Sequence, residues 1–422
     1  MKYSRILLFL LILLLGNGCV KRDEAKPSSS TIVVNQRPNT NIVTHQEPQV
    51  IIEQQPQVIT QQPQIITQQP PHIIQPQPQP QPQQLSQVQQ TLMEVSRIRS
   101  PYLSGVYANN PKLRRFIDEM VRKYNFRRDY LYGLFSSVNR DVKALKKYNV
   151  IGKPKARQKE NSVGSWDRYP RFVTEDRIQN GIEFWNNNRY YLEKAYYIYH
   201  VPPEYILGII GVETNFGRNT GKHRLIDALT SLSLEYKKRS SFFTKQLEEY
   251  LLLTKEQKMN PLKIRGSYGG AFGIVQFMPD SFRKYAVDFN GDGIANLFDP
   301  ADAIGSTANF FINKGKWQPN LPVAMRVLYP KKRLYGLKTG YKTEYSQEYL
   351  KSLGMRPTGD FNGYRGPVSL IKLSHYDRDE LWWGTKNFYA IARYNPRDYY
   401  VMSVHLLAQA IKNRYYQIYG NQ

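Results

Sequence analysis

The hydrophobic and polar positions divide the chain into three stretches. The first holds an unbroken apolar run from Ile6 to Leu15. The second, from about residue 26 to residue 90, has few apolar residues and no helical period. From about residue 91 apolar residues take helical spacing, first at Leu113, Phe116, Ile117, Met120 and Val121. The pattern therefore predicts that the folded part of the chain is residues 91–422.

Within the folded part, helical patterns surround one region of a different kind. The apolar run 206–212 follows Pro202 and Pro203, which fit the first turn of a helix, and Gly217 is expected to end that helix. Residues 323–373 are rich in Gly, Tyr and β-branched residues, which is typical of short strands and loops. We therefore predict an α+β, mainly α fold. Its expected parts are a core at about 200–320, a β-containing insert at about 321–375 and a helical part at about 376–418.

The N-terminal apolar run has the features of a secretion signal. Lys2 and Arg5 precede it, and it is too short to span a bilayer core of about 30 Å as a helix. Cys19, the only cysteine, follows directly, so no intramolecular disulfide can form. The arrangement resembles the bacterial lipoprotein signal, although Gly16 stands where an aliphatic residue is usual. It implies a signal peptide at 1–18, lipidation of Cys19 and a periplasmic protein; simple secretion remains the alternative.

Residues 19–90 are expected to form a tether. They are rich in Pro and Gln, and a loose Pro-Gln-Val/Ile-Ile repeat recurs every seven or eight residues between residues 48 and 74. Regular proline blocks helices and removes the donors of a strand ladder. We therefore predict an extended, mostly disordered segment that links the membrane to the folded part. Val20 after the cysteine indicates sorting to the outer membrane.

The charge lies almost entirely on the folded part. The formal charge is +25, and the first ninety residues contribute only +2 of it. Such a basic body favours a polyanionic partner. For a secreted protein, the peptide carboxylates of peptidoglycan and anionic lipid headgroups are the candidates, and a solvated basic surface without a partner is the alternative. The signal peptide and the lack of a reader motif exclude nucleic acid.

Residues 288–299 have the layout of an EF-hand calcium loop. Oxygen-bearing side chains stand at loop positions 1, 3, 5 and 12, a glycine stands at position 6, and position 7 offers a backbone carbonyl. The predicted ligands are Asp288, Asn290, Asp292, Ile294 and Asp299. Asp299 replaces the usual Glu and is one methylene shorter. The sequence predicts a Ca²⁺ site, with a calcium-free turn as the alternative.

Glu213 is the candidate catalytic residue. It stands at the end of the apolar run 206–212, where desolvation would raise its pKa, as a general acid near neutral pH requires. A buried structural ion pair with Arg218 or Arg224 would explain the same pattern. Residue type alone leaves both interpretations open.

The sequence around Glu213 resembles the membrane-bound lytic murein transglycosylase B family, and the likeness extends in order over about residues 110–415. The residues that carry it include Gly208 to Thr214 with Gly217, Asp227-Ala228-Leu229, Gly266-Ser267, Gln276-Phe277-Met278-Pro279 and Arg393-Tyr394-Asn395.

This resemblance implies a lysozyme-like fold and non-hydrolytic cleavage of peptidoglycan glycan strands between N-acetylmuramic acid and N-acetylglucosamine. Glu213 would act as acid and then as base, giving 1,6-anhydro ends. The calcium loop would be structural, and no organic cofactor is implied. By resemblance, the substrate groove is lined by Ser267, Gln276, Tyr394, Asn395 and Tyr400, and Arg239 would hold a carboxylate of the substrate.

Two other functions remain open from the sequence. A hydrolytic muramidase would need a second carboxylate or a placed water opposite Glu213, and Asp227 or Glu235 are the candidates for that carboxylate. A tethered peptidoglycan-binding lipoprotein without activity would need no intact motif around Glu213. Cell-wall synthesis or division proteins are further candidate partners.

Overall fold

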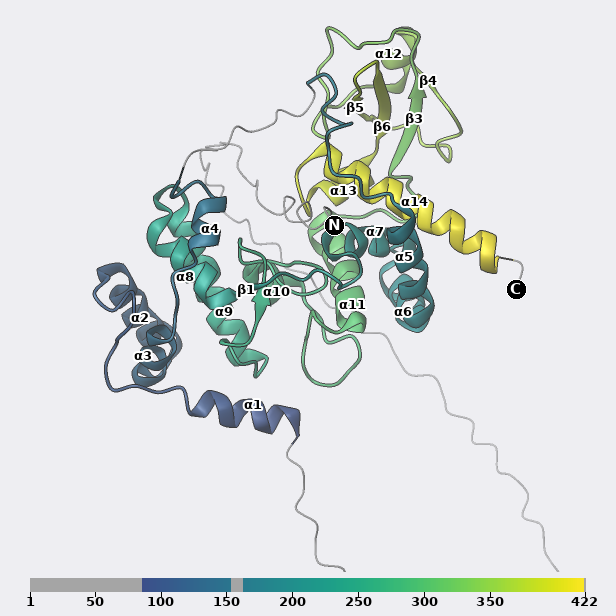
Figure 1. Cartoon of the computed structure of the whole chain (residues 1–422). Coiled ribbons are helices and arrows are strands. Elements are labelled where there is room, and N and C mark those ends of the chain that lie inside the picture. Colours follow the sequence, from purple (N-terminus) through teal and green to yellow (C-terminus); the bar gives the residue numbers. More distant parts are fainter. Residues whose placement is uncertain (1–85, 153–161, 421–422) are drawn as a thin grey trace, which may run out of the picture. The chain divides into compact units, whose positions relative to one another are not determined.

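The computed structural model describes residues 86–152 and 162–420. The predicted signal peptide, Cys19 and the tether up to residue 85 lie outside the described residues. The described part contains fourteen α-helices (Figure 1). In chain order they are α1 (Gln87–Ser96), α2 (Pro111–Tyr124), α3 (Arg128–Ser136), α4 (Val142–Lys147), α5 (Glu175–Asn187), α6 (Arg189–Tyr199), α7 (Pro203–Thr214), α8 (Leu225–Glu235), α9 (Ser240–Glu256), α10 (Pro279–Tyr285), α11 (Pro300–Phe310), α12 (Gln347–Ser352), α13 (Lys386–Ala392) and α14 (Asp398–Tyr419).

Short elements complete the described fold. They are the 3₁₀ turn η1 (Lys237–Arg239), the π-helical turn η2 (Phe311–Gly315), and the strands β1 (His223–Arg224), β2 (Arg265–Gly266), β3 (Ala324–Leu328), β4 (Arg356–Pro357), β5 (Ser369–Ser374) and β6 (Asp379–Gly384). Helices predominate over strands, so the predicted α+β, mainly α class is confirmed.

Helical structure begins earlier than the predicted start at residue 91. Ser86 caps α1, because its hydroxyl accepts the N–H of Gln89 while the Gln89 side chain accepts the N–H of Ser86. This reciprocal capping box satisfies two N–H groups that a helix start otherwise leaves unpaired. The predicted tether therefore ends before residue 86 rather than at residue 90.

Helices α7 and α14 lie in close contact at the centre of the main core. Two glycines of α7 permit this approach. A Cβ atom at Gly208 would come within 2.8 Å of the Val404 carbonyl oxygen, and one at Gly211 within 2.7 Å of the Leu407 side chain. Because α14 lies outside the predicted core range of 200–320, that range is too narrow.

A four-stranded antiparallel sheet, in the order β4-β3-β6-β5, has its own apolar cluster. Strand β5 joins this cluster to the main core, since successive strand side chains point to opposite faces. Leu370 contributes to the sheet's cluster, whereas Ile371 and Leu373 belong to the main core. The predicted limit of the β region at residue 375 is wrong, because β6 extends to Gly384. On β6, Leu381 and Trp383 point into the sheet's cluster with the two-residue period of a strand.

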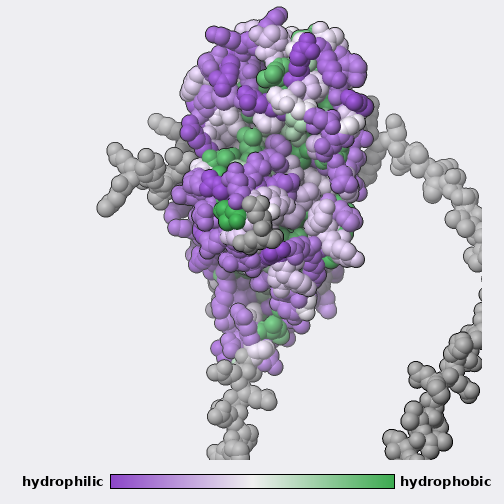
Figure 2. Space-filling model, turned by 90° about the vertical axis from the view of Figure 1, so that its right-hand side faces the viewer, coloured by the Kyte–Doolittle hydropathy of each residue, from purple (hydrophilic) through white to green (hydrophobic). Residues whose placement is uncertain are grey.

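The face seen in Figure 2 is mainly hydrophilic, with hydrophobic side chains in small separate areas. Within residues 86–152 and 162–420, no helix combines the length and the apolar character needed to cross a membrane.

Candidate active site

Glu213 occupies the last turn of α7. The helix begins with Pro203 in its first turn, and every residue from Glu204 to Val212 is buried. Helix α7 ends at Thr214, three residues before the predicted stop, because Asn215, Phe216 and Gly217 all take left-handed conformations, with φ of 51°, 58° and 82°. This sharp reversal leaves the Glu213 side chain at the end of an apolar helix.

The carboxyl group of Glu213 has one hydroxyl donor. Tyr400, fully buried on α14, donates a hydrogen bond of 2.6 Å to Oε1 of Glu213. The Glu213 side chain as a whole is partly exposed. Its carboxyl group, however, is surrounded by protein atoms and is therefore desolvated. Burial raises the pKa of Glu213 to about 8, and the Tyr400 hydrogen bond offsets part of the rise. At pH 7 the carboxyl group is therefore mostly protonated and able to donate a proton.

The ion-pair interpretation of Glu213 does not hold. Arg218 pairs with Glu183 at 2.9 Å, and Arg224 pairs with Asp227 at 2.7 Å. Since neither arginine pairs with Glu213, the buried carboxyl group is not the structural half of a salt bridge with either.

The two candidate second carboxylates are also held elsewhere. Asp227 accepts hydrogen bonds from Arg224 and from the backbone N–H of Asn139. Glu235 accepts hydrogen bonds of 2.6 Å each from Arg140 and from the hydroxyl of Tyr107. Neither carboxylate contributes to the raised pKa of Glu213. Both carboxylates are thus engaged by arginine side chains.

A glycine-rich loop between β2 and α10 is fastened to the end of α7. The Thr214 hydroxyl donates to the Ile274 carbonyl at 2.6 Å, and the Tyr394 hydroxyl donates to the carbonyl of Val275. Tyr394 also lies close enough to Glu213 for the carboxylate charge to help raise the pKa of the tyrosine, after the larger effect of burial. The structure therefore brings Tyr394 and Tyr400 together with Glu213.

Ser267 and Gln276 lie in this loop, and their side chains bond to backbone groups of the loop and of Thr220. The Ser267 hydroxyl accepts the N–H groups of Gly269 and Ala271, and Gln276 Nε2 donates to the carbonyls of Thr220 and Gly273. Both residues are buried, as is Asn395. These contacts shape the loop. A substrate contact by these side chains would have to use the hydroxyl hydrogen of Ser267 or Oε1 of Gln276.

Arg239 is the last residue of the 3₁₀ turn η1, which follows α8. Its guanidinium stands 4.0 Å from the ring centroid of Phe242, and its charge lowers the pKa of Tyr148 slightly against the dominant effect of burial. The ring of Tyr148 lies 5.9 Å from that of Tyr268, which follows Ser267 in the chain. Aromatic rings thus connect the position of Arg239 to the glycine-rich loop, with no contact to Glu213.

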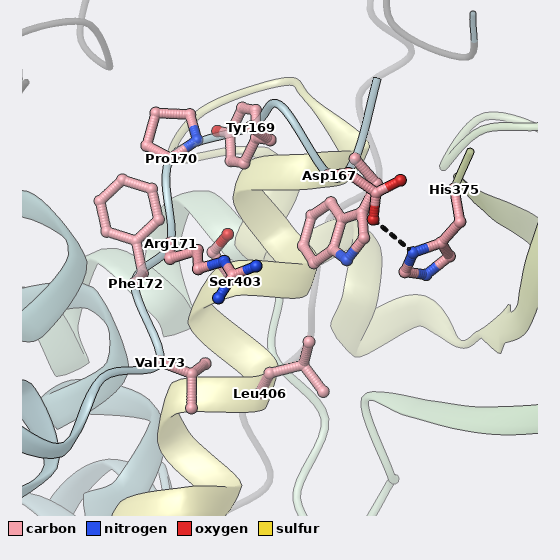
Figure 3. Close-up of a pocket in the computed structure, with 10 residues that line it drawn as sticks. Asp167, Tyr169, Pro170, Arg171, Phe172, Val173, His375, Ser403 and Leu406 are labelled. Atoms are coloured by element: carbon pink, nitrogen blue, oxygen red, sulfur yellow. Dashed lines mark hydrogen bonds and ion pairs between the residues drawn. The ribbon is translucent and has the colours of Figure 1, made fainter. Parts of the chain in front are cut away.

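The segment 162–172, which no sequence motif marked as part of the site, crosses α14 beside it. Trp166 and Tyr169 both meet the ring of Tyr399 edge to face, at 5.0 and 5.4 Å. A cavity of about 300 Å³ adjoins them, and Figure 3 shows the hydrogen bond between Asp167 and His375 at its edge. The closely spaced aromatic residues of this segment were the only sequence pattern that pointed to it. They follow neither a helical nor a strand period, so the pattern could not predict where they lie in the fold.

The predicted calcium loop has the expected turn geometry. The carboxylate of Asp288 accepts N–H groups from Gly291, Asp292 and Gly293. Gly291 and Gly293 take φ values of 83° and 89°, which favour glycine, and a Cβ atom there would meet nothing within 4 Å. No cationic side chain of the described residues pairs with Asp288 or Asp292. Hard oxygen donors in an open loop without a competing cation fit Ca²⁺.

At the far end of the loop, the predicted ligand Asp299 has a further structural contact. Asp299 Oδ1 caps α11 by accepting the N–H groups of Ala301 and Asp302. In the described part of the chain no three His, Cys, Asp or Glu side chains are grouped for a metal ion. A Ca²⁺ site here would therefore depend on the amide of Asn290 and the carbonyl of Ile294 together with the carboxylates.

Comparisons with known proteins agree with this geometry. The Transglycosylase SLT domain family matches residues 108–409. Membrane-bound lytic murein transglycosylase B of Escherichia coli (strain K12) is 41% identical over 311 residues, 73% of this chain and 85% of that protein.

Solved structures give the same relationship. The E. coli lytic transglycosylase SLT35 in complex with calcium matches with a TM-score of 0.68 at 40% identity, covering 74% of this chain and 96% of that one. Catenated lytic transglycosylase SltB1 from Pseudomonas aeruginosa matches with a TM-score of 0.66 at 38% identity, covering 74% of this chain and 100% of that one. The chain belongs to the membrane-bound lytic murein transglycosylase B family, has its lysozyme-like fold and is a peptidoglycan lytic transglycosylase.

Proposed function

We propose that Glu213 alone supplies the acid and the base of the cleavage. In the first step the protonated carboxyl group donates its proton to the oxygen between N-acetylmuramic acid and N-acetylglucosamine as the glycosidic bond breaks. The observation that carries the proposal is the enclosed carboxyl group, which has a pKa of about 8 and accepts a hydrogen bond from the Tyr400 hydroxyl.

In the second step the carboxylate of Glu213 takes the proton of the muramic acid C6 hydroxyl. The C6 oxygen bonds to the anomeric carbon and closes a 1,6-anhydro ring, so the carboxyl group is protonated again and no water is consumed. A two-carboxylate glycosidase would need a second acid beside the bond. The ion pairs of Asp227 and Glu235 support the mechanism with one carboxylate.

Muropeptides released from purified sacculi test this mechanism. Mass spectrometry should find muramic acid ends lighter by one water than muramidase products. Reducible muramic acid ends would instead support hydrolysis, and release of neither product would support a binding protein without activity.

Tyr394, Tyr400 and Asn395 are proposed to line the substrate groove beside Glu213. Ser267 and Gln276 would contribute mainly by holding the glycine-rich loop in shape, since their side chains bond to its backbone. Arg239 is proposed to contact a peptide or lactyl carboxylate away from the scissile bond. Arg239→Ala should then raise KM for peptide-bearing glycan and leave KM for peptide-free glycan unchanged.

Calcium is proposed to bind Asp288, Asn290, Asp292, the Ile294 carbonyl and Asp299. The calcium complex of SLT35 supports this, as does the turn geometry of the loop. The ion would neutralise the exposed carboxylates and hold the loop; the residues proposed for the chemistry lie on α7 and α14.

Anchoring through a lipid on Cys19, with outer-membrane sorting, is also proposed. The E. coli relative is described as membrane-bound, which supports a periplasmic protein held at a membrane. Replacing Cys19 with Ser should abolish fatty-acid labelling and membrane fractionation while activity of the released protein persists. A variant that still fractionates with outer membranes would contradict lipid anchoring. Cell-wall synthesis or division proteins remain candidate partners.

A further inference from the structure

A second cavity lies toward the opposite end of α7 from Glu213. Its volume is about 410 Å³. Tyr205 of α7 lines it and stands eight residues before Glu213, which corresponds to about 12 Å along the helix axis. The other side chains that matter for its chemistry are Tyr196, Trp317, His405 and Gln409. The cavity is therefore separate from the site around Glu213.

Aromatic rings form part of the wall of this cavity. The rings of Tyr205 and Trp317 lie 5.1 Å apart between centroids, and the ring of His405 stacks on that of Tyr205 at 6.1 Å. Tyr196 stands at the rim and is 49% exposed. Flat apolar faces with a few placed polar groups are typical of pockets that bind small organic ligands.

The polar groups of the cavity are mostly neutral. His405 is 6% exposed, and burial lowers its pKa to about 4, so the ring is uncharged at neutral pH. Its Nδ1 and the Gln409 amide both bond to the Tyr205 hydroxyl, at 3.1 and 3.2 Å. The two charged side chains, Glu204 and Lys412, pair with each other at 2.8 Å. This lining favours an uncharged ligand that carries hydroxyl or amide groups.

Trp317 adds a second, independent observation. Its indole Nε1 is buried and has no hydrogen-bond partner in the part of the chain that the structure describes. A buried indole N–H normally finds an acceptor, so this donor is available to one. The unpartnered donor stands in the same wall as the aromatic rings.

We propose that this cavity binds an N-acetylhexosamine ring of the glycan, at a position other than the bond being cut. The identity of the sugar rests on the proposed function, whereas the site itself rests on the cavity. Such a site would hold murein against the enzyme through successive cleavages, independently of Glu213.

Nuclear magnetic resonance of the full chain tests the proposal with tri-N-acetylchitotriose as the probe. The Glu213→Gln variant is used so that no turnover occurs. The chain has five tryptophans, so the indole N–H signal of Trp317 can be assigned by comparison with Trp317→Phe. We expect a saturable shift of this signal and a separate shift of backbone amides in residues 394–400.

Two further variants locate the binding. Tyr196→Ala combined with Gln409→Ala should weaken the Trp317 response about tenfold, through lost ring contact and a lost hydrogen bond, while the response of residues 394–400 persists. Tyr197→Ala is the matched control, because Tyr197 is the next residue on α6, is 83% exposed and does not line the cavity. It should change neither response.

The possible failures can be told apart. Shifts at residues 394–400 without any at Trp317 would overturn the second site and leave the proposed function standing. A Trp317 response without one at residues 394–400 would support the cavity and count against the proposed substrate groove. An equal Trp317 response to maltotriose, which lacks acetamido groups, would overturn the assignment to N-acetylhexosamine.

Discussion

The end of α7 and the loop 288–299 both carry carboxyl groups, but the surroundings of these groups differ in burial and in hydrogen bonding. Glu213 is enclosed by protein, accepts one hydrogen bond from Tyr400 and has a pKa raised to about 8. Asp288 is exposed and accepts three backbone N–H groups. The first environment keeps a proton on the carboxyl group, whereas the second leaves the carboxylate open to solvent and orients it through the loop backbone.

The carboxyl group of Asp302 has a third kind of environment. It is fully buried, yet its two oxygens accept the N–H groups of Phe289, Asn290 and Asn296. Burial raises its pKa, and the three backbone hydrogen bonds act against that rise. Asp302 therefore acts as an anchor for the calcium loop. The surroundings of a carboxyl group, rather than its residue type, thus suit it to the proposed role of proton donor or cation ligand, or to that of a structural anchor.

The largest effect is expected from Glu213→Gln. The amide keeps the volume but can neither give up nor retake the proton, so turnover of sacculi should fall by about 10²–10⁴-fold or more. Release of anhydromuropeptides, followed by mass spectrometry, measures it. Full activity of this variant would remove Glu213 from the chemistry altogether.

The same substitution should change stability with a defined sign. A pKa raised from 4.5 to about 8 means that the folded state holds a proton which the unfolded state loses between these pH values. Wild-type stability from this group therefore falls as pH rises through that window. Glu213→Gln should unfold at a higher temperature than wild type, with a difference that grows from pH 5 to pH 8. A constant difference across this range would contradict the raised pKa.

Asp302→Ala is expected to lower the free energy of unfolding by about 3 kcal/mol, because three buried or partly buried N–H groups lose their acceptor. Urea unfolding measures the loss. Asp302→Asn keeps one acceptor oxygen and should fall between wild type and Asp302→Ala. If the two variants were equally stable, the backbone hydrogen bonds would not be the cause.

Calcium should stabilise the protein through Asp288. At a free concentration one hundredfold above its dissociation constant, calcium should add about 2.7 kcal/mol, and Asp288→Ala should remove this dependence. Melting temperatures with calcium and with chelator measure the effect. Asp360→Ala, at an exposed position on another loop, is the control. A wild-type melting temperature that changes with neither calcium nor chelator would contradict the proposed calcium site.

The parts of the site that the sequence could predict were those with a local pattern. The apolar run before Glu213 and the Asp and Gly spacing of the loop 288–299 are confined to a dozen residues each, and the structure has the helix and the turn there. Ser86 and Gln89 also form a local pattern, the capping box that starts α1.

The remaining features depend on residues that are far apart in the chain. Tyr400 meets Glu213 across 187 positions, and only the family resemblance could pair them. The hydrogen bonds that occupy Ser267 and Gln276, and the capping role of Asp299, arise from the folded backbone. Strand β6 was missed because its two-residue period covers only six residues beside a helical stretch.

The smallest predicted effect concerns the hydrogen bond that moderates Glu213. Tyr400→Phe removes the hydroxyl and keeps the ring in its buried position. Because that hydrogen bond lowers the pKa of Glu213 against the effect of burial, its loss should raise the pKa further. The acid step needs the protonated carboxyl group, so kcat/KM of the wild type should decline as pH rises through about 8.

In Tyr400→Phe this alkaline decline should move by about one pH unit to higher pH, which is the value of one ordinary hydrogen bond. The rate at neutral pH should fall only about tenfold, because the carboxyl group stays protonated but the base of the second step is less well held. Tyr399→Phe is the matched control: Tyr399 is the adjacent buried tyrosine, and its hydroxyl bonds to Ser165 rather than to Glu213. Its alkaline decline should stay at the wild-type position. If Tyr400→Phe left the decline in place as well, the group that titrates would not be Glu213, and the contrast between the enclosed carboxyl group and the exposed calcium loop would lose its functional meaning.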